Sequence, residues 1–265
     1  MNKKLIAIDL DGTLLKKDET LGEYSQKVLS RLIEEGHLVI LTSGRPTRSL
    51  LPIYKQMNGN APIISYNGAV IFNPSDNCFP YMKKCIPAEF ALKIIKEGEK
   101  IFSSIVLDDS LFLYSLRNDN YLKKYFPYEG IKTKFGKINS FPNKEILSCV
   151  FKSSHKYDEE LKKLLHGSNK IKLRHWRNSF YSELYLEEVN KGNALQYILD
   201  YYKIKKEDCI GFGDSFNDLS MLERVGQPFA MKNAKSKILL EKFNVTKKSN
   251  TQEGVALTLA SLFNF

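Results

Sequence analysis

A short apolar strand that ends in two carboxylates is the feature that most limits what this chain can fold into. Leu5–Ile8 is wholly apolar and is followed by Asp9 and, two positions later, by Asp11. Such a run is typical of a parallel strand buried on both faces of an open α/β sheet, where ligands bind at the carboxyl ends of the strands. An acidic side chain there is costly unless it takes part in chemistry or holds a metal ion. Gly12 lets the chain turn sharply after the acids.

Strands and helices alternate over the first eighty residues. Apolar residues at helical spacing predict helices at 25–35 and 47–57. Apolar runs predict strands at 38–41 and 62–65, and 69–72 is expected to return as a hairpin. This alternation favours an α/β fold with a doubly wound, Rossmann-like and mostly parallel sheet.

The pattern changes in the middle of the chain and then returns. A helix is expected at 87–100, and strands at 103–116 and 144–152, which indicates a separate α+β unit. We therefore expect a core made of 1–82 and 186–265, with an insert at 83–185. For the rest of the core the sequence predicts helices at 192–202, 219–225 and 254–262, a strand at 208–212, and short edge strands at 228–231 and 244–246.

Charge and cysteine content exclude some classes of protein. The net charge is +10, and the segment from Met82 to Leu184 holds 20 Lys+Arg against 12 Asp+Glu, a balance of +8. A solvated lysine-rich surface is the simpler interpretation, and steering of an anionic substrate is the alternative. The chain has no basic-aromatic signature of nucleic-acid binding and no apolar run of membrane-spanning length. Four scattered cysteines favour a reduced, cytoplasmic protein, and nothing indicates its oligomeric state.

Polar residues of similar character follow three predicted strands. A parallel sheet would bring these strand ends to one edge, together with Lys191, which precedes a predicted helix. Carboxylates at that density repel one another unless a hard cation such as Mg²⁺ neutralises them. The residues concerned are Asp9 and Asp11, then Thr42, Ser43 and Gly44, then Asp214, Asn217 and Asp218.

These motifs together resemble those of the haloacid dehalogenase superfamily, and most closely the Cof-type sugar-phosphate phosphatases. The resemblance covers essentially the whole chain and extends to Met231–Ala234 and Thr246–Gly254, with Lys232 where these relatives usually have glycine. The four motifs are Asp9-x-Asp11-Gly12-Thr13, Ser43-Gly44-Arg45, Lys191, and Gly213-Asp214-x-x-Asn217-Asp218.

The resemblance implies a role for each motif residue. Asp9 would attack phosphorus to form an aspartyl-phosphate, and Asp11 would act as general acid and then as general base. Mg²⁺ would be held by Asp9, the backbone carbonyl of Asp11, and Asp214. Asp218 would orient Lys191 or a metal-bound water. Thr42 would be a second supporting residue, and it would replace Ser43 if the register is shifted by one. The phosphoryl group would be bound by Leu10, Ser43, Gly44, Lys191 and Asn217.

Asp11 favours phosphoester hydrolysis over dehalogenation, because an alkoxide leaving group needs a proton and a halide does not. The short segment between Gly12 and Thr42 leaves no room for a large cap, so the insert at 83–185 is expected to be the cap that covers the substrate. We expect a small phosphorylated metabolite, with sugar phosphates first, and no nucleic-acid or membrane partner.

Several alternatives stay open. Arg45 could contact the substrate or the cap, or pair with an acid; Arg174 and Trp176 could recognise a sugar or belong to the core of the insert. Each motif taken alone could be a turn, a helix cap or a surface lysine, but all four in order favour catalysis. The competing functions are a phosphomutase or phosphotransferase, a regulator that binds a phosphorylated metabolite without turnover, and a nucleic-acid-binding module that uses the basic insert.

Overall fold

The structure is a computed structural model that describes residues 3–98, 100–126, 130–136, 145–154, 157–165, 170–176 and 179–265. The chain divides into two compact units. The first contains Met1–Lys83 and Asn190–Phe265, and the second contains Lys84–Val189. These limits differ from the expected insert, 83–185, by one residue at its start and four at its end.

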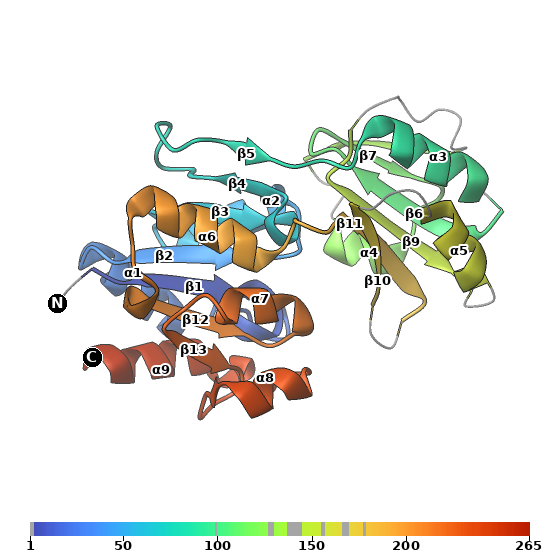
Figure 1. The fold of residues 1–265 in the computed structure, drawn as a ribbon. Coiled ribbons are helices and arrows are strands. Elements are labelled where there is room, and N and C mark those ends of the chain that lie inside the picture. The colour runs from blue at the N-terminus through green and yellow to red at the C-terminus, as the bar shows by residue number, and fades with distance from the viewer. Residues whose placement is uncertain are drawn as a thin grey trace. The chain divides into compact units, whose positions relative to one another are not determined.

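The first unit is built on an eight-stranded sheet (Figure 1) with the strand order β14-β13-β12-β1-β2-β3-β4-β5. The pairings from β14 to β3 are parallel, and β4 and β5 add to the edge in antiparallel fashion. Its strands are β1 (Leu5–Asp9), β2 (Leu38–Thr42), β3 (Ile63–Ser65), β4 (Val70–Phe72), β5 (Met82–Lys83), β12 (Cys209–Gly213), β13 (Gln227–Ala230) and β14 (Asn244–Val245).

Helices cover both faces of this sheet, which confirms the expected α/β class. Alternate residues of β1 point to opposite faces, so that Ile6 and Ile8 join one core cluster and Leu5 and Ala7 the other. The first cluster includes residues of α1 (Glu23–Glu34), α2 (Thr47–Gln56) and α9 (Gly254–Phe263). The second includes residues of α6 (Lys191–Tyr202), α7 (Leu219–Leu222) and α8 (Lys237–Lys242).

The second unit is an α+β layer with a six-stranded sheet in the order β10-β11-β9-β6-β7-β8. Residues of α3 (Ala88–Gly98) and α5 (Asp158–Leu165) pack in one apolar cluster of this unit, and Leu122 of α4 (Asn120–Tyr125) packs in another. The strands are β6 (Phe102–Asp108), β7 (Phe112–Ser115), β8 (Lys132–Phe135), β9 (Ser148–Ser153), β10 (Ile171–His175) and β11 (Tyr181–Leu186).

The sequence-based expectations fail mainly in the insert. The sequence analysis predicts no strands for the hairpin of β10 and β11, because apolar residues are mixed with charged and aromatic ones there. The expected strand at 144–152 is observed from Ser148, and Lys144 lies outside the described residues. In the core, the 228–231 segment is not an edge strand, since β13 pairs with β12 and β14 on its two sides.

Candidate active site

A buried lysine connects two strand ends at the carboxyl edge of the core sheet. Lys191 is the first residue of α6 and has no exposed surface. Its Nζ donates to Asp9 Oδ1 at the end of β1, and to Asp218 Oδ1, 2.6 Å away, in the turn after β12. Because β1 and β12 are parallel neighbours, their carboxyl ends bring Asp9 and the Asp214–Asp218 turn together.

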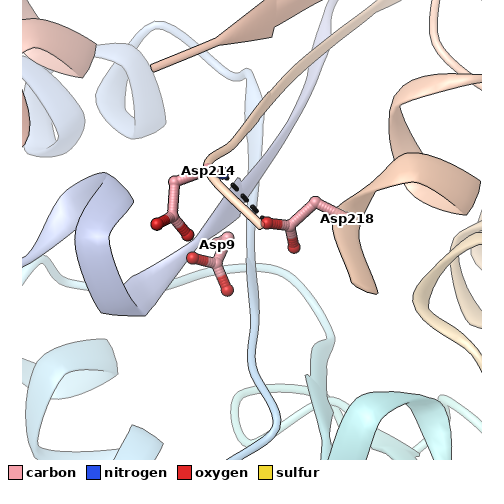
Figure 2. Close-up of side chains that lie close together, drawn as sticks. All are labelled: Asp9, Asp214 and Asp218. Atoms are coloured by element: carbon pink, nitrogen blue, oxygen red, sulfur yellow. Dashed lines mark hydrogen bonds between the residues drawn. The ribbon is translucent and has the colours of Figure 1, made fainter. Parts of the chain in front are cut away.

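Asp218 shapes the turn that carries Asp214. Its Oδ2 accepts hydrogen bonds from the backbone N–H groups of Asp214 (3.0 Å) and Ser215 (2.9 Å), while its Oδ1 receives Lys191. Figure 2 shows the Asp214 and Asp9 carboxylates near each other and the Asp218 hydrogen bond to the Asp214 backbone. With both oxygens engaged, Asp218 acts on the site through Lys191 and the Asp214 backbone.

The charges of this cluster are unbalanced. Asp9, Asp214 and Asp218 are at most 5% exposed; Lys191 is hydrogen-bonded to Asp9 and Asp218, and the charge of Lys235 acts on Asp214. Burial, and then the charge of Asp218, raise the pKa of Asp9 well above its ordinary value despite Lys191. Burial and Asp218 also raise the pKa of Asp214 to about 6. Burial alone would lower the pKa of Lys191, but Asp218 and Asp9 outweigh it and raise that pKa.

The same cluster fits a hard divalent cation. Asp9, Asp214 and Asp218 each offer an oxygen within 4.8 Å of the others. Asp214 Oδ2 is buried and has no hydrogen-bond partner within the described part of the chain, a condition that costs free energy unless something binds there. The three carboxylates outnumber Lys191, the ammonium that is hydrogen-bonded to them, and a divalent cation would offset the excess negative charge. Asp9 and Asp214 are the side chains best placed to hold it, since the oxygens of Asp218 are occupied.

Gly12 makes room for the Asp214 carboxylate. It follows Asp11 in the turn formed by Leu10–Leu14 and has a φ of 80°, in the left-handed region that favours glycine. A Cβ atom at this position would lie 2.5 Å from Asp214 Oδ2. The carbonyl of Gly12 in turn accepts a hydrogen bond of 2.7 Å from Asn233 Nδ2.

Asp11 is paired with Arg45. The side chain of Asp11 is 43% exposed, and its two oxygens accept from Nε and Nη2 of Arg45 in a bidentate pair. Arg45 Nη2 also donates to Glu19 Oε2 at 2.8 Å. Of the alternatives for Arg45, the structure thus shows pairing with acids. The bidentate contact with the guanidinium fixes the orientation of the Asp11 carboxylate.

The expected phosphate-binding residues lie around the strand ends. Ser43 follows β2 and its Oγ accepts from the backbone N–H of Arg45 at 3.0 Å. Leu10 packs its side chain in the core, so only its backbone can face a ligand. Thr42 directs its hydroxyl to Met221 Sδ, 3.5 Å away, and not to the carboxylates.

Two asparagines, Asn67 and Asn233, belong to this region although the sequence predicts no role for either. Asn217 Nδ2 donates to Asn67 Oδ1 at 3.0 Å, and Asn67 follows β3. Asn233 also accepts from the backbone N–H of Asn250 at 2.9 Å. Asn67 sits in an Asn-Gly turn signal, and Asn233 lies in the Met231–Ala234 segment, but neither signal says which side chains the residue meets.

Arg174 and Trp176 lie in the second unit and are both engaged there. Arg174 donates to Glu183 Oε2 at 2.7 Å, and its guanidinium carbon lies 4.9 Å from the centre of the Tyr185 ring. Trp176 packs its ring 5.1 Å from Tyr125 and donates to Glu183 Oε2 at 3.4 Å. The two side chains therefore share Glu183 as a partner.

Lys232, which stands where the family that the motifs resemble usually has glycine, has no positive φ, so this replacement of glycine carries no left-handed backbone strain. Its N–H donates to Thr246 Oγ1 at 3.0 Å.

Comparison with known proteins decides the family. The sequence profile of the haloacid dehalogenase-like hydrolases matches residues 6–259. The chain belongs to this family. The resemblance inferred from the four motifs is thereby confirmed, and so is the expectation of a hydrolase.

Relatives of this haloacid dehalogenase-like hydrolase match it along its whole length. The protein named 5-amino-6-(5-phospho-D-ribitylamino)uracil phosphatase YitU of Bacillus subtilis is 31% identical over 267 residues, which cover 98% of this chain and 97% of the relative. A putative phosphatase of Haemophilus influenzae is 29% identical and covers 99% of each chain.

Solved structures share its fold. A haloacid dehalogenase-like hydrolase from Bacteroides thetaiotaomicron superposes with a TM-score of 0.85 at 23% identity, covering 99% of this chain and 100% of the other. A sugar phosphatase of subclass IIB of the superfamily gives a TM-score of 0.79 at 21% identity and covers 99% of each chain.

None of the helices in the described part of the chain has both the length and the hydropathy of a membrane-spanning segment.

Replacement of Gly12 should weaken metal binding. In Gly12→Ala, the added methyl group would displace Asp214 Oδ2, so we expect the rise in melting temperature on addition of Mg²⁺ to be lost. Gly36→Ala is the matched control, because Gly36 has a φ of 88° but open space around a Cβ. It should lower stability by about 1 kcal/mol and keep the Mg²⁺ response. The measurement is thermal unfolding with and without Mg²⁺. An equal rise in melting temperature in the two variants would contradict this interpretation.

Stabilisation by Mg²⁺ should depend on pH. Because the pKa values of Asp9 and Asp214 are raised in the folded protein, folding favours their protonated forms, and this contribution is lost as the pH rises through about 6 for Asp214. Mg²⁺ competes with these protons and should therefore stabilise the protein more at pH 8 than at pH 5. At a hundredfold excess over its Kd, it should add about 2.7 kcal/mol at pH 8, roughly 5–10 °C in melting temperature. A rise that is equal at both pH values would be the contrary result.

Proposed function

We propose that this haloacid dehalogenase-like hydrolase is a Mg²⁺-dependent phosphomonoesterase that acts through an aspartyl-phosphate. The observation that carries the proposal is the Asp9–Lys191–Asp218 cluster, with the unpartnered oxygen of Asp214 beside it. Such a cluster leaves Asp9 as a carboxylate nucleophile next to a fixed positive charge. The relatives named as phosphatases support the reaction class.

In this proposal an oxygen of Asp9 attacks phosphorus while the bond between phosphorus and the leaving oxygen breaks. Asp11 donates its proton to the leaving alkoxide, then takes a proton from a water molecule that attacks the aspartyl-phosphate. This second step releases inorganic phosphate and restores the Asp9 carboxylate. Mg²⁺, held by Asp9, Asp214 and the Asp11 carbonyl, would supply positive charge to the phosphoryl oxygens.

The chain's own donors would bind the rest of the phosphoryl group. Lys191, Asn217 and the Ser43–Gly44 turn offer an ammonium, an amide and hydroxyl or backbone N–H groups, and the Leu10 backbone would add a further donor. Asp218 positions Lys191, and Thr42 supports the end of β2 from within the core.

We propose a small phosphorylated metabolite as substrate and the second unit, Lys84–Val189, as the cap that selects it. A sugar phosphate is favoured by the sugar phosphatase among the similar structures, and a phosphorylated ribityl compound by the name of the Bacillus relative. Both kinds of compound are phosphomonoesters that carry several hydroxyl groups. The free cysteines of the described chain are consistent with a cytoplasmic location, which is also part of the proposal.

The reaction class can be tested with p-nitrophenyl phosphate. We expect turnover with Mg²⁺, none with EDTA, and a loss of at least about a thousandfold in Asp9→Asn, because the nucleophile is removed. Asp11→Asn should fall further with a sugar phosphate than with p-nitrophenyl phosphate, since nitrophenolate leaves without a proton. Asp200→Asn, on the exposed surface of α6, is the control and should keep wild-type turnover. A folded, Mg²⁺-loaded wild type without turnover would instead support a mutase or a binding regulator.

The role of the second unit can be tested through Arg174. Arg174→Gln removes its ion pair with Glu183, and we expect KM for the preferred sugar phosphate to rise about tenfold while p-nitrophenyl phosphate is hydrolysed as before. Lys172→Gln is the matched control, since Lys172 lies on the same strand and pairs with Glu187 at 3.6 Å. Equal KM values in both variants, measured over a panel of sugar phosphates, would remove Arg174 from substrate selection.

A further inference from the structure

Asn67 lies at the meeting point of the groups proposed to bind the phosphoryl oxygens. It follows β3 and is only 8% exposed. Its Oδ1 accepts a hydrogen bond of 3.0 Å from Asn217 Nδ2, which comes from a segment 150 residues further along the chain. The side chain thus joins the turn after β3 to the turn after β12, across the end of the strands that carry Asp9 and Ser43.

The same residue sets the turn after β2. The backbone N–H of Asn67 donates to the Ser43 carbonyl at 2.9 Å, and that of Tyr66 donates to the Arg45 carbonyl at 3.0 Å. The Asn67 amide also fills the space beside Gly44, where its nitrogen lies 3.0 Å from the position that a Cβ would take. The Ser43–Gly44 turn therefore rests against Asn67 through both backbone and side chain.

The backbone at this point is held in an uncommon conformation. Tyr66 has a φ of 50° and Asn67 a φ of 56°, so two residues with side chains follow each other in the left-handed region. Asparagine tolerates this region better than most residues, but tyrosine does not. Such a conformation persists when the surroundings enforce it, and here Ser43, Arg45 and Asn217 supply the enforcing hydrogen bonds.

The contact with Asn67 also fixes how Asn217 can bind. The amide nitrogen of Asn217 carries two hydrogens, and one is directed at Asn67 Oδ1. This hydrogen bond fixes the plane of the Asn217 amide and the side on which its N–H groups lie. The second hydrogen has no partner shown among the described residues, so it remains for a ligand.

We propose that Asn67 is a positioning residue, which orients the Asn217 amide and the Ser43–Gly44 turn so that their donors converge on the phosphoryl group. The inference rests on the proposed function. Asn67 acts through Asn217 and the turn, and no contact of its own with the substrate is required. Loss of its amide leaves Asn217 free to rotate, which weakens binding of a phosphoryl group in the transition state.

The test compares Asn67→Gly with Asn58→Gly. Glycine keeps the positive φ at both positions and removes the amide, and Asn58, with a φ of 55°, is an exposed residue after α2 and outside the site. We expect Asn67→Gly to lower kcat/KM for p-nitrophenyl phosphate about 10- to 100-fold and to weaken inhibition by orthovanadate by a similar factor. Asn58→Gly should match the wild type in both, and the two variants should melt within about 5 °C of each other.

A double-mutant cycle separates positioning from a general structural effect. Glycine at position 67 keeps the backbone N–H that contacts Ser43, so the loss in Asn67→Gly is expected to pass mainly through the Asn217 amide. Adding Asn67→Gly to Asn217→Ala should therefore cost less than about threefold. Losses that multiply in the double variant, or an Asn67→Gly variant as active as Asn58→Gly, would overturn the inference and leave the proposed function standing. Failure of the proposed function would be seen in the wild type itself, as absence of both turnover and orthovanadate binding, and the inference would fall with it.

Discussion

Lys191 carries a positive charge with no exposed surface, and the arrangement of the strand ends depends on it. Its two partners, Asp9 and Asp218, come from the carboxyl end of β1 and from the turn after β12. Removing one member of a buried, hydrogen-bonded set of charges typically costs 3–5 kcal/mol, because the others are left uncompensated. The first residue of a helix is also an unfavourable place for a cation, since the amino end of the helix dipole is positive. Lys191 therefore stabilises the two acidic strand ends through its pairs with Asp9 and Asp218, although the start of a helix is an unfavourable place for its charge.

The buried acids of the site lower the stability of the folded protein. Three buried carboxylates lie close together, and burial, followed by the charge of Asp218, raises the pKa values of Asp9 and Asp214. An amide in place of one of these acids would lower the cost. The presence of all three acids, with an oxygen of Asp214 that has no partner among the described residues, is understandable if a cation completes the charge balance. The negative charge that lowers stability without a metal ion is then the same charge that would attract the ion.

The sequence predicted much of the core and little of the insert, for a physical reason. Strands β1, β2 and β12 are buried on both faces, so each appears as an uninterrupted apolar run whose end is visible in the sequence. In contrast, β10 and β11 mix apolar with charged and aromatic residues, and the pattern was ambiguous. The site shows the same division. Asp9, Asp214 and Lys191 follow from strand ends and motif spacing, whereas Asn67 depends on a positive φ and on a partner 150 residues away, which no local pattern shows.

Side chains in both units are held by specific neighbours, but the strand ends that carry Asp9 and Asp214 belong to the first unit. In the first unit, most of the groups at the site are fixed by the backbone of a strand end or by a neighbour: Asp218 holds the Asp214 backbone, Asn67 holds Asn217, and Asn233 holds the Gly12 carbonyl. A change of any of these residues is expected to displace its neighbours, so the groups at the strand ends behave as one unit. In the second unit, Arg174 and Trp176 share Glu183 as a partner, and each also contacts an aromatic ring. These contacts lie wholly within the second unit. Residues there can therefore be substituted while the hydrogen bonds around Asp9 and Asp214 are kept.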